Sequence, residues 1–278
     1  MSQSALVGIA RPFSIRTSSH MSNRKPIPVV IPYFRAPEKL ERCLAALKAQ
    51  REIATEVFVR DNSQDNILYT KAVNEGLRKF SYSDQYDYAL VLTQDCYLQP
   101  DCLLNLVKSM EFDSQCGIVA PVQVDSNNNP SWFGSLQAFP WGVHRLSGQM
   151  GLPVPINTFW ANGACMLLRT QMIREIGLLD ENMLFIASDS DYSMTARARG
   201  WHVMVAPNAI AQHSLDASSA GGEIAPNPMI NQTKLKDVLY FAKKWTNGDL
   251  FRELSYKPEE LTPEAIATHI DNLKSGLR

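Results

Sequence analysis

The sequence has no apolar run long enough to cross a bilayer and no block of one charge sign. A membrane-spanning helix needs about 20 consecutive, mainly apolar residues, and no stretch of the 278 residues approaches that length. Lys and Arg number 27 and Asp and Glu number 28, so the formal net charge is −1. A nucleic-acid-binding surface uses a basic excess that this chain lacks. We therefore expect a globular protein with no transmembrane segment and no nucleic-acid partner.

Cysteine is scarce, and its spacing argues against a disulfide framework. The chain has five cysteines, an odd number, and none of them forms a C-x-x-C pair. Most lie in apolar contexts, so we expect reduced thiols in a reducing compartment and hence a cytoplasmic protein.

Acidic residues are absent from residues 1–25, which contain four basic residues and many serines. This bias is typical of organelle transit peptides. The alternative is a disordered extension, with Met21 as the true start, and of the two we favour a disordered extension. In either interpretation, residues 1–25 are expected to lie outside the fold.

Short apolar runs alternate with helical segments over residues 26–123. Runs at residues 28–32, 57–59, 88–92 and 117–121 are continuous rather than alternating, as expected for strands that are covered on both faces. Between the first two, Leu40, Cys43, Leu44 and Leu47 form one apolar helical stripe. This alternation predicts βαβ units. The expected fold is α/β, with a Rossmann-like, mixed but mainly parallel sheet flanked by helices.

Three of the predicted strands end in polar turns. Arg35, Asp61 and Asp95 follow the strands at residues 28–32, 57–59 and 88–92. Each of them alone could be an ordinary solvated loop residue. Because ligands of open parallel sheets bind beyond the carboxyl ends of the strands, the repetition predicts that the three side chains face one crevice.

Residues 124–158 lack helical or strand periodicity and predict a long loop region. Extended to residue 160, this region contains Trp132, Trp141 and Trp160, which argues against disorder. Two interpretations stay open: a hydrophobic cluster that pins the loop, or a platform of flat rings beneath a sugar or an amphipathic acceptor.

The rest of the chain returns to alternating elements. We expect a strand at residues 161–168, helices at 170–176 and 188–199, a strand at 201–206 ended by Pro207, and an extended piece at 210–213. Ser188 and Asp191 fit a capping box at the start of the second of these helices. A helix at 234–245 and a terminal helix beginning near Thr262 form a C-terminal helical extension.

The order of these features resembles the family 2 glycosyltransferases and their rhamnosyltransferase-like relatives, which are inverting enzymes with the GT-A fold. The resemblance covers residues 26–213. It rests on eight pieces in the family's order: VVIPY at 29–33, VRDNSQD at 59–65, Asn74 with Gly76, LVLTQD at 90–95 before Pro100, NGACMLLR at 162–169, IGLLDE at 176–181, DSD at 189–191, and Arg197 with Gly200.

The resemblance implies that a sugar moves from a nucleoside-diphosphate donor to a hydroxyl acceptor, which is a glycan, a lipid-linked molecule or a small molecule. It implies a hydrogen bond from the nucleotide base to Asp61, with Tyr33, Arg35 and Gln94 lining the nucleotide pocket. Together with the composition of residues 1–25 and the helical pattern near the C-terminus, it predicts four parts: residues 1–25 as a disordered or processed extension, 26–123 as the nucleotide-sugar half, 124–232 as the acceptor-binding and catalytic half of the same domain, and 233–278 as the helical extension.

The resemblance further implies a divalent cofactor, Mn or Mg, held by Asp95 and, more weakly, by His213. Asp189 matches the family's catalytic base and Asp191 is the fallback. Two departures stand out. Only Asp95 is acidic where many members carry two or three acids, which leaves the metal dependence open, and Ser188 replaces an acid often found before the base.

Two competing functions remain. A non-catalytic relative that binds a nucleotide sugar or a glycan would explain why Asp95 is the only acid at its turn and why Ser188 stands in place of an acid. A sugar nucleotidyltransferase fits less well, because residues 33–37 contain no glycine where such enzymes carry a glycine-rich, basic loop. The sequence does not specify the donor base, the sugar, the acceptor or the oligomeric state. Contact with a membrane surface also stays open, since many such acceptors are lipid-linked.

Overall fold

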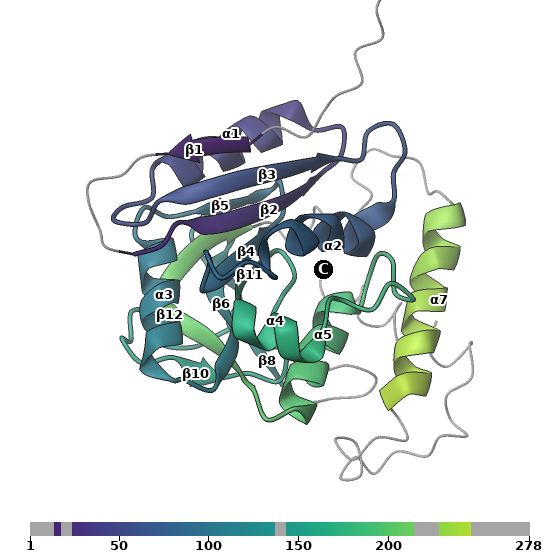
Figure 1. Cartoon of the computed structure of the whole chain (residues 1–278). Coiled ribbons are helices and arrows are strands. Elements are labelled where there is room, and N and C mark those ends of the chain that lie inside the picture. Colours follow the sequence, from purple (N-terminus) through teal and green to yellow (C-terminus); the bar gives the residue numbers. More distant parts are fainter. Residues whose placement is uncertain (1–13, 18–23, 137–142, 214–227, 246–278) are drawn as a thin grey trace, which may run out of the picture.

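The computed structural model describes residues 14–17, 24–136, 143–213 and 228–245 (Figure 1). Ten strands of this part of the chain form one sheet: β1 Ser14–Thr17, β2 Ile27–Tyr33, β3 Thr55–Asp61, β4 Tyr88–Leu92, β5 Cys96–Leu98, β6 Cys116–Val124, β7 Pro130–Trp132, β10 Ile156–Asn157, β11 Cys165–Arg169 and β12 His202–His213. Their order is β1-β3-β2-β4-β11-β6-β12-β10, with β5 paired to β12 and β7 paired to β6.

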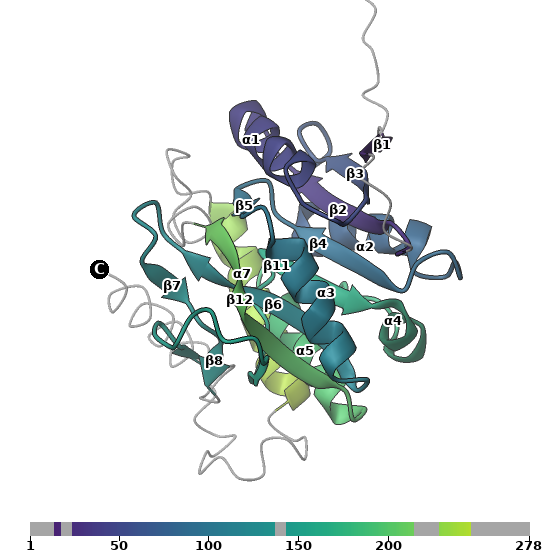
Figure 2. The same cartoon turned by 90° about the vertical axis from the view of Figure 1, so that its left-hand side faces the viewer.

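Helices cover both faces of this sheet. Their bounds are α1 Pro37–Lys48, α2 Leu68–Phe80, α3 Cys102–Phe112, α4 Thr170–Ile176, α5 Ser188–Ala198 and α7 Pro228–Trp245. Cys43 and Leu47 of α1 share one core with apolar side chains of α3, and a second core contains apolar side chains of α2 and α4 together with Tyr192 and Ala196 of α5. Figure 2 shows the same layers, with α3 in front of β6 and β12 and α5 behind them.

The sheet is mixed, and its long strands run parallel within two groups. β2 pairs in parallel with β3 and β4, and β6 pairs in parallel with β12, while β11 is antiparallel to its neighbours β4 and β6. Every residue of β6 and all but the first of β4 are buried, as the continuous apolar runs predicted. The predicted α/β, mainly parallel sheet flanked by helices is therefore confirmed.

The prediction that Pro207 ends a strand is wrong. β12 runs through Pro207 as far as His213. Its pairing with β6 is irregular between Ala206 and Ile210, where the register shifts. A proline has no N–H for the ladder, and a bulge of this kind is where a strand tolerates one. The long strand matters because it delivers His213 to the carboxyl end of the sheet.

Part of the N-terminal extension belongs to the fold, contrary to expectation. Residues 14–17 form β1, which pairs antiparallel with β3 and covers its outer edge. An uncovered edge strand presents free N–H and C=O groups, and β1 satisfies those of β3. This pairing joins segments some 40 residues apart, and local sequence patterns do not reveal it.

The long loop region and the C-terminus also differ in detail from expectation. Residues 130–157 include β7 and β10, and the strands β8 Ser135–Leu136 and β9 Val143–His144 form a separate antiparallel pair. The predicted helix at 234–245 begins earlier, at Pro228. The helix predicted near Thr262 lies outside the described residues. Among the residues that the structure describes, no helix is both long and apolar enough to cross a membrane.

Candidate active site

The carboxyl ends of β2, β3 and β4 meet at one edge of the sheet. Tyr33 pairs with Asp61 in the parallel register, and the Asn62 amide donates a hydrogen bond to the Tyr33 carbonyl over 2.8 Å. The Gln94 side chain exchanges two hydrogen bonds with the backbone of Phe34, at 2.7 and 3.1 Å. The three strand ends therefore lie together, and that Arg35, Asp61 and Asp95 face one crevice stays a prediction.

The turn after β3 holds Arg35 and Asp61 in defined positions. Arg35 adopts a left-handed backbone with φ of 43°, and its Nε donates to the carbonyl of Ser63 over 3.1 Å. Asp61 accepts a hydrogen bond from the Ser63 amide through Oδ1, at 2.8 Å. Within the described part of the chain, no hydrogen-bond donor contacts Oδ2 of Asp61, so this oxygen is the one that remains for a ligand. Gln94 differs, because both ends of its amide already bind Phe34, so its contribution is to hold the strand ends together.

Asp95 and His213 form a pair of suitable metal ligands. His213 Nε2 lies 3.8 Å from Asp95 Oδ1, and His213 Nδ1 lies 3.0 Å from the Gln123 side-chain oxygen. An amide oxygen only accepts hydrogen bonds, so Nδ1 carries the hydrogen and the lone pair of Nε2 faces the carboxylate. Burial lowers the pKa of His213, although the charge of Asp95 opposes this, which favours the neutral, ligating imidazole.

This donor set fits a divalent ion that also binds phosphate. One imidazole and one carboxylate suit Mn, and phosphate oxygens and water would supply the remaining ligands. No group of three or more His, Cys, Asp or Glu side chains among the described residues could hold a metal by itself. A metal at this position would need further ligands besides Asp95 and His213.

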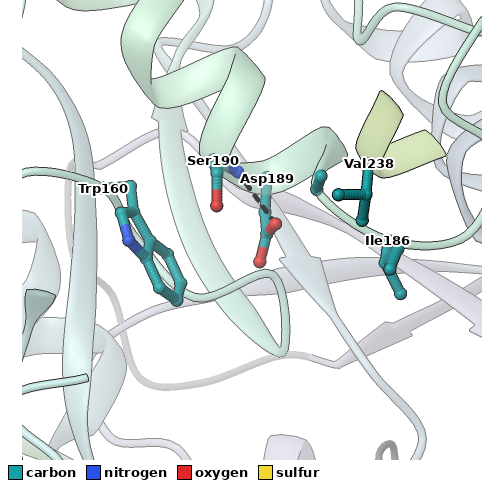
Figure 3. Close-up of a pocket in the computed structure, with 6 residues that line it drawn as sticks. Trp160, Ile186, Asp189, Ser190 and Val238 are labelled. Carbon is teal, nitrogen blue, oxygen red and sulfur yellow. Dashed lines mark hydrogen bonds between the residues drawn. The ribbon is translucent and has the colours of Figure 1, made fainter. Parts of the chain in front are cut away.

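Asp189 lies in the first turn of α5 and lines a cavity of about 140 Å³. Its Oδ2 accepts a hydrogen bond from the Gly163 amide and its Oδ1 accepts one from the Ser190 amide, both at 2.8 Å. Trp160, Ile186 and other apolar groups line the same cavity (Figure 3). Burial raises the pKa of Asp189, and the two amides lower it in part. A carboxylate of this kind is a competent general base.

The turn at residues 162–164 joins Asp189 to the strand end that carries Asp95. β11 is antiparallel to β4, so the beginning of β11 lies at the carboxyl end of β4. The Thr93 amide donates to the Ala164 carbonyl over 2.9 Å, and the neighbouring Gly163 amide donates to Asp189. Tyr69 Oη donates to the Gly163 carbonyl over 2.7 Å. Asp189 and Asp95 therefore belong to one edge of the sheet.

The capping box predicted for Ser188 and Asp191 is not formed. The N-cap of α5 is Ala187, with a left-handed φ of 64°, and no side chain caps the helix. Asp191 is 1% exposed, and it binds the Trp245 indole N–H at 2.7 Å and the Lys244 ammonium at 2.9 Å. Both partners belong to α7. The fallback base is thus engaged in attaching α7, and it is not among the residues that line the cavity.

The three tryptophans of the loop region have different surroundings. Trp132 is fully buried, in agreement with the interpretation as a hydrophobic cluster. Trp160 is 4% exposed, its ring centroid lies 6.2 Å from that of Trp132, and it lines the Asp189 cavity. Trp141 lies outside the described residues. Of the proposed acceptor platform, the structure places Trp160 beside the candidate base.

Residues of α7 that act on this site were missed by sequence reasoning. Asp237 accepts hydrogen bonds from the loop before α5, Val238 lines the cavity, and Lys244 and Trp245 bind Asp191. The sequence predicts that this segment is helical, but it carries no motif and its partners lie about 50 residues away. An amphipathic pattern alone does not show what the polar face contacts.

Comparisons with known proteins identify the family and the fold. The sequence model described as glycosyltransferase like family 2 matches residues 68–224. A solved structure, the crystal structure of GalNAc-T7 with UDP, GalNAc and Mn2+, is similar with a TM-score of 0.57 and 13% identity; the match covers 82% of this chain and 49% of that chain. The chain thus spans about half the length of that structure, and the similarity shows the GT-A fold. No curated protein matches the sequence significantly.

Proposed function

Since the chain belongs to the glycosyltransferase-like family 2, we propose that it transfers a sugar from a nucleoside-diphosphate donor to a hydroxyl acceptor with inversion. The observation that carries the proposal is the arrangement at one edge of the sheet. There, Asp189 lines a cavity and binds the amide of Gly163 in the turn at residues 162–164. The carbonyl of Ala164 in the same turn accepts a hydrogen bond from Thr93, two residues before Asp95. A base and a diphosphate site are the two parts that a single displacement requires.

The donor would bind across the ends of β2, β3 and β4. Tyr33 and Arg35 would contact the nucleoside, and the free oxygen of Asp61 would accept a hydrogen bond from the base. Asp95 and His213 would hold Mn or Mg together with the diphosphate. When bound, such an ion neutralises the negative charge on the departing diphosphate.

Asp189 would act as the base on the acceptor side. As the acceptor oxygen forms its bond to the anomeric carbon, the bond from that carbon to the diphosphate oxygen breaks, and the hydroxyl proton moves to Asp189. An ionised carboxylate has about four acceptor positions, and the two amides use two of them. The carboxylate therefore keeps room for the acceptor hydroxyl, and its raised pKa suits a proton acceptor.

The acceptor would lie against Trp160 and the apolar groups of the cavity. A glycan, a lipid-linked molecule and a small alcohol all offer the required hydroxyl beside an apolar face. We place the reaction in the cytoplasm or at a membrane surface facing it. The five buried, free cysteines are consistent with a reducing compartment.

A thermal-shift screen tests the donor site. The probes are UDP and UDP-sugars first, since GalNAc-T7 was crystallised with UDP and Mn2+, followed by other nucleoside diphosphates, each with and without Mn. A ligand at 100 times its Kd adds about 2.7 kcal/mol to stability. In a chain of this size, that raises Tm by about 5–10 °C.

The expected pattern has three parts: one nucleotide raises Tm, Mn increases the rise, and Asp95→Ala loses most of it. Asp101→Ala is the matched control, because it removes an exposed acid whose partner is Arg51. If no nucleotide raises Tm, or if both variants respond like the wild type, the proposed donor site is wrong.

A further inference from the structure

A buried carboxylate on α7 binds the loop that precedes Asp189. Asp237 is 1% exposed. Its Oδ1 accepts a hydrogen bond from the Leu184 amide at 3.1 Å, and its Oδ2 accepts from the amides of Phe185 and Ile186 at 2.7 and 3.0 Å. Three successive backbone N–H groups therefore converge on one side chain that comes from another element.

The three amide hydrogen bonds compensate for the burial of the Asp237 carboxylate. A buried charge is costly unless hydrogen bonds compensate it, so the three amides are what stabilises this carboxylate. In return, the carboxylate satisfies three N–H groups that belong to no helix or strand. The interaction therefore holds the loop against α7.

This loop determines where Asp189 lies. On its other side, the Thr70 amide of α2 donates to the Leu184 carbonyl over 3.0 Å. The chain then turns through the left-handed Ala187 into α5, whose first turn no side chain caps. The start of α5 therefore lacks a side-chain cap within its own segment. Besides the Gly163 amide that binds Asp189 directly, the contacts that α2 and α7 make to the loop hold this start in place.

α7 also forms a wall of the cavity. Val238, which follows Asp237, lines the cavity with Ile186, Ala187 and Asp189 (Figure 3). The far end of α7 is attached to α5 through Lys244 and the buried Asp191. One helix therefore contacts both the loop before the candidate base and the helix that carries it.

We propose that Asp237 is a positioning residue for Asp189, and that α7 is thereby part of the active site. The carboxylate of Asp237 holds the turn at residues 184–187 and so directs Asp189 into the cavity. The inference rests on the proposed function, in which Asp189 is the base.

The first measurement follows the titration of Asp189 by NMR on protein labelled with 13C at the aspartate carboxyl carbons, with Asp189→Asn to assign the resonance. In Asp237→Asn the loop loosens and water enters the cavity, so the pKa of Asp189 is expected to fall toward the ordinary aspartate value. Asp180→Asn is the control. Asp180 binds Lys244 of α7 and is not a partner of the amides of residues 184–186, and Tyr69, whose hydroxyl interacts electrostatically with Asp189, remains in both variants.

The second measurement separates positioning from general stability. With the nucleotide sugar that raises Tm most, Asp237→Asn is expected to lower kcat about 10- to 100-fold while the donor KM changes less than twofold, because the displaced group is on the acceptor side. Asp237→Glu restores the charge and is expected to recover part of kcat. If Asp237→Asn does not fold, Asp237→Glu, whose carboxylate is displaced by one methylene group, takes its place in both experiments.

An Asp189 pKa and a kcat that are unchanged in a folded Asp237 variant would overturn the inference, and so would equal effects of Asp237→Asn and Asp180→Asn. The two proposals fail separately. If the wild type transfers no sugar, the proposed function is wrong, whereas the NMR titration still decides whether Asp237 positions Asp189.

Discussion

At the scale of single residues, Asp189 depends on a glycine that leaves no space for a side chain. The Gly163 amide donates to Asp189 while its carbonyl accepts from Tyr69. A Cβ at position 163 would lie 2.8 Å from Tyr69 Oη and 3.1 Å from Cβ and Oδ2 of Asp189. The small residue allows the backbone to approach the carboxylate closely enough for a direct hydrogen bond.

Gly163→Ala is therefore expected to destabilise the fold by about 1–3 kcal/mol, the usual cost of overpacking. It should also slow transfer, because the new methyl group displaces Asp189. Urea unfolding and initial rates measure the two effects. The double variant Gly163→Ala, Tyr69→Phe removes the closest contact, so its loss of stability should be smaller than the sum of the two single losses. Strict additivity would contradict the steric explanation.

Sequence reasoning selected Asp189, Asp95, His213 and Asp61 from a resemblance in order and spacing, and the structure brings them to one edge of the sheet. Their roles remain predictions. The resemblance ranked Asp189 above Asp191 as the base, although two acids in a first helical turn look alike in the local sequence. What separates them is α7, which binds Asp191 through Lys244 and Trp245, and that contact spans more than 50 residues.

At the scale of elements, α7 is attached to α5 by a hydrogen bond to a buried charge. The Trp245 indole N–H donates to Asp191 at 2.7 Å, and burial raises the pKa of that carboxyl although Lys244 opposes the shift. Removal of the donor leaves a buried carboxylate with one partner fewer. Hydrogen bonds to charged groups contribute about 1.5–3 kcal/mol each.

Trp245→Phe is expected to lower the free energy of unfolding by about 2 kcal/mol or more, measured by urea denaturation. Trp201→Phe is the matched control, since its indole N–H donates to Glu175 on the surface, where water replaces a lost donor. Both changes remove a similar ring volume from a buried site. We expect Trp245→Phe to cost about 1–2 kcal/mol more than the control; equal costs would argue against the anchoring role of Asp191.

Elements with strong local periodicity were predicted well, and those that depend on distant pairing were not. The buried runs of β2, β4 and β6 and the apolar stripe of α1 identified these elements from sequence. β1 forms by pairing with the otherwise open edge of β3. β12 continues through Pro207 because it pairs with β6 on both sides of the register shift. Neither fact is encoded in the local sequence of the segment itself.

At the scale of the whole molecule, one edge of the sheet serves both halves of the proposed reaction. The parallel group β3-β2-β4 brings the residues of the proposed donor site together. β11 is antiparallel to β4, so the turn that precedes β11 lies at the same edge, where Gly163 binds Asp189. β12 adds His213 from the other parallel group. The order of the strands therefore explains how residues from 33 to 213 in the chain can form one site.

This arrangement predicts that donor binding and proton transfer can be separated. The residues proposed to bind the nucleotide lie at the ends of β2, β3 and β4, whereas Asp189 lies on α5 and lines the cavity. A variant of the base should therefore bind the donor normally. A non-catalytic relative, by contrast, would bind a nucleotide sugar and show no turnover even as wild type.

The assignment of Asp189 as the base is tested most directly by comparing Asp189→Asn with the wild type. Calorimetry measures the donor affinity of both, and an assay with the same donor and Mn measures their transfer rates. The account predicts a Kd within twofold of the wild type and a rate at least about 100-fold lower, since a positioned base contributes about 10²- to 10⁴-fold. Equal losses of affinity and rate, or a rate that survives the substitution, would contradict the assignment of Asp189 as the base.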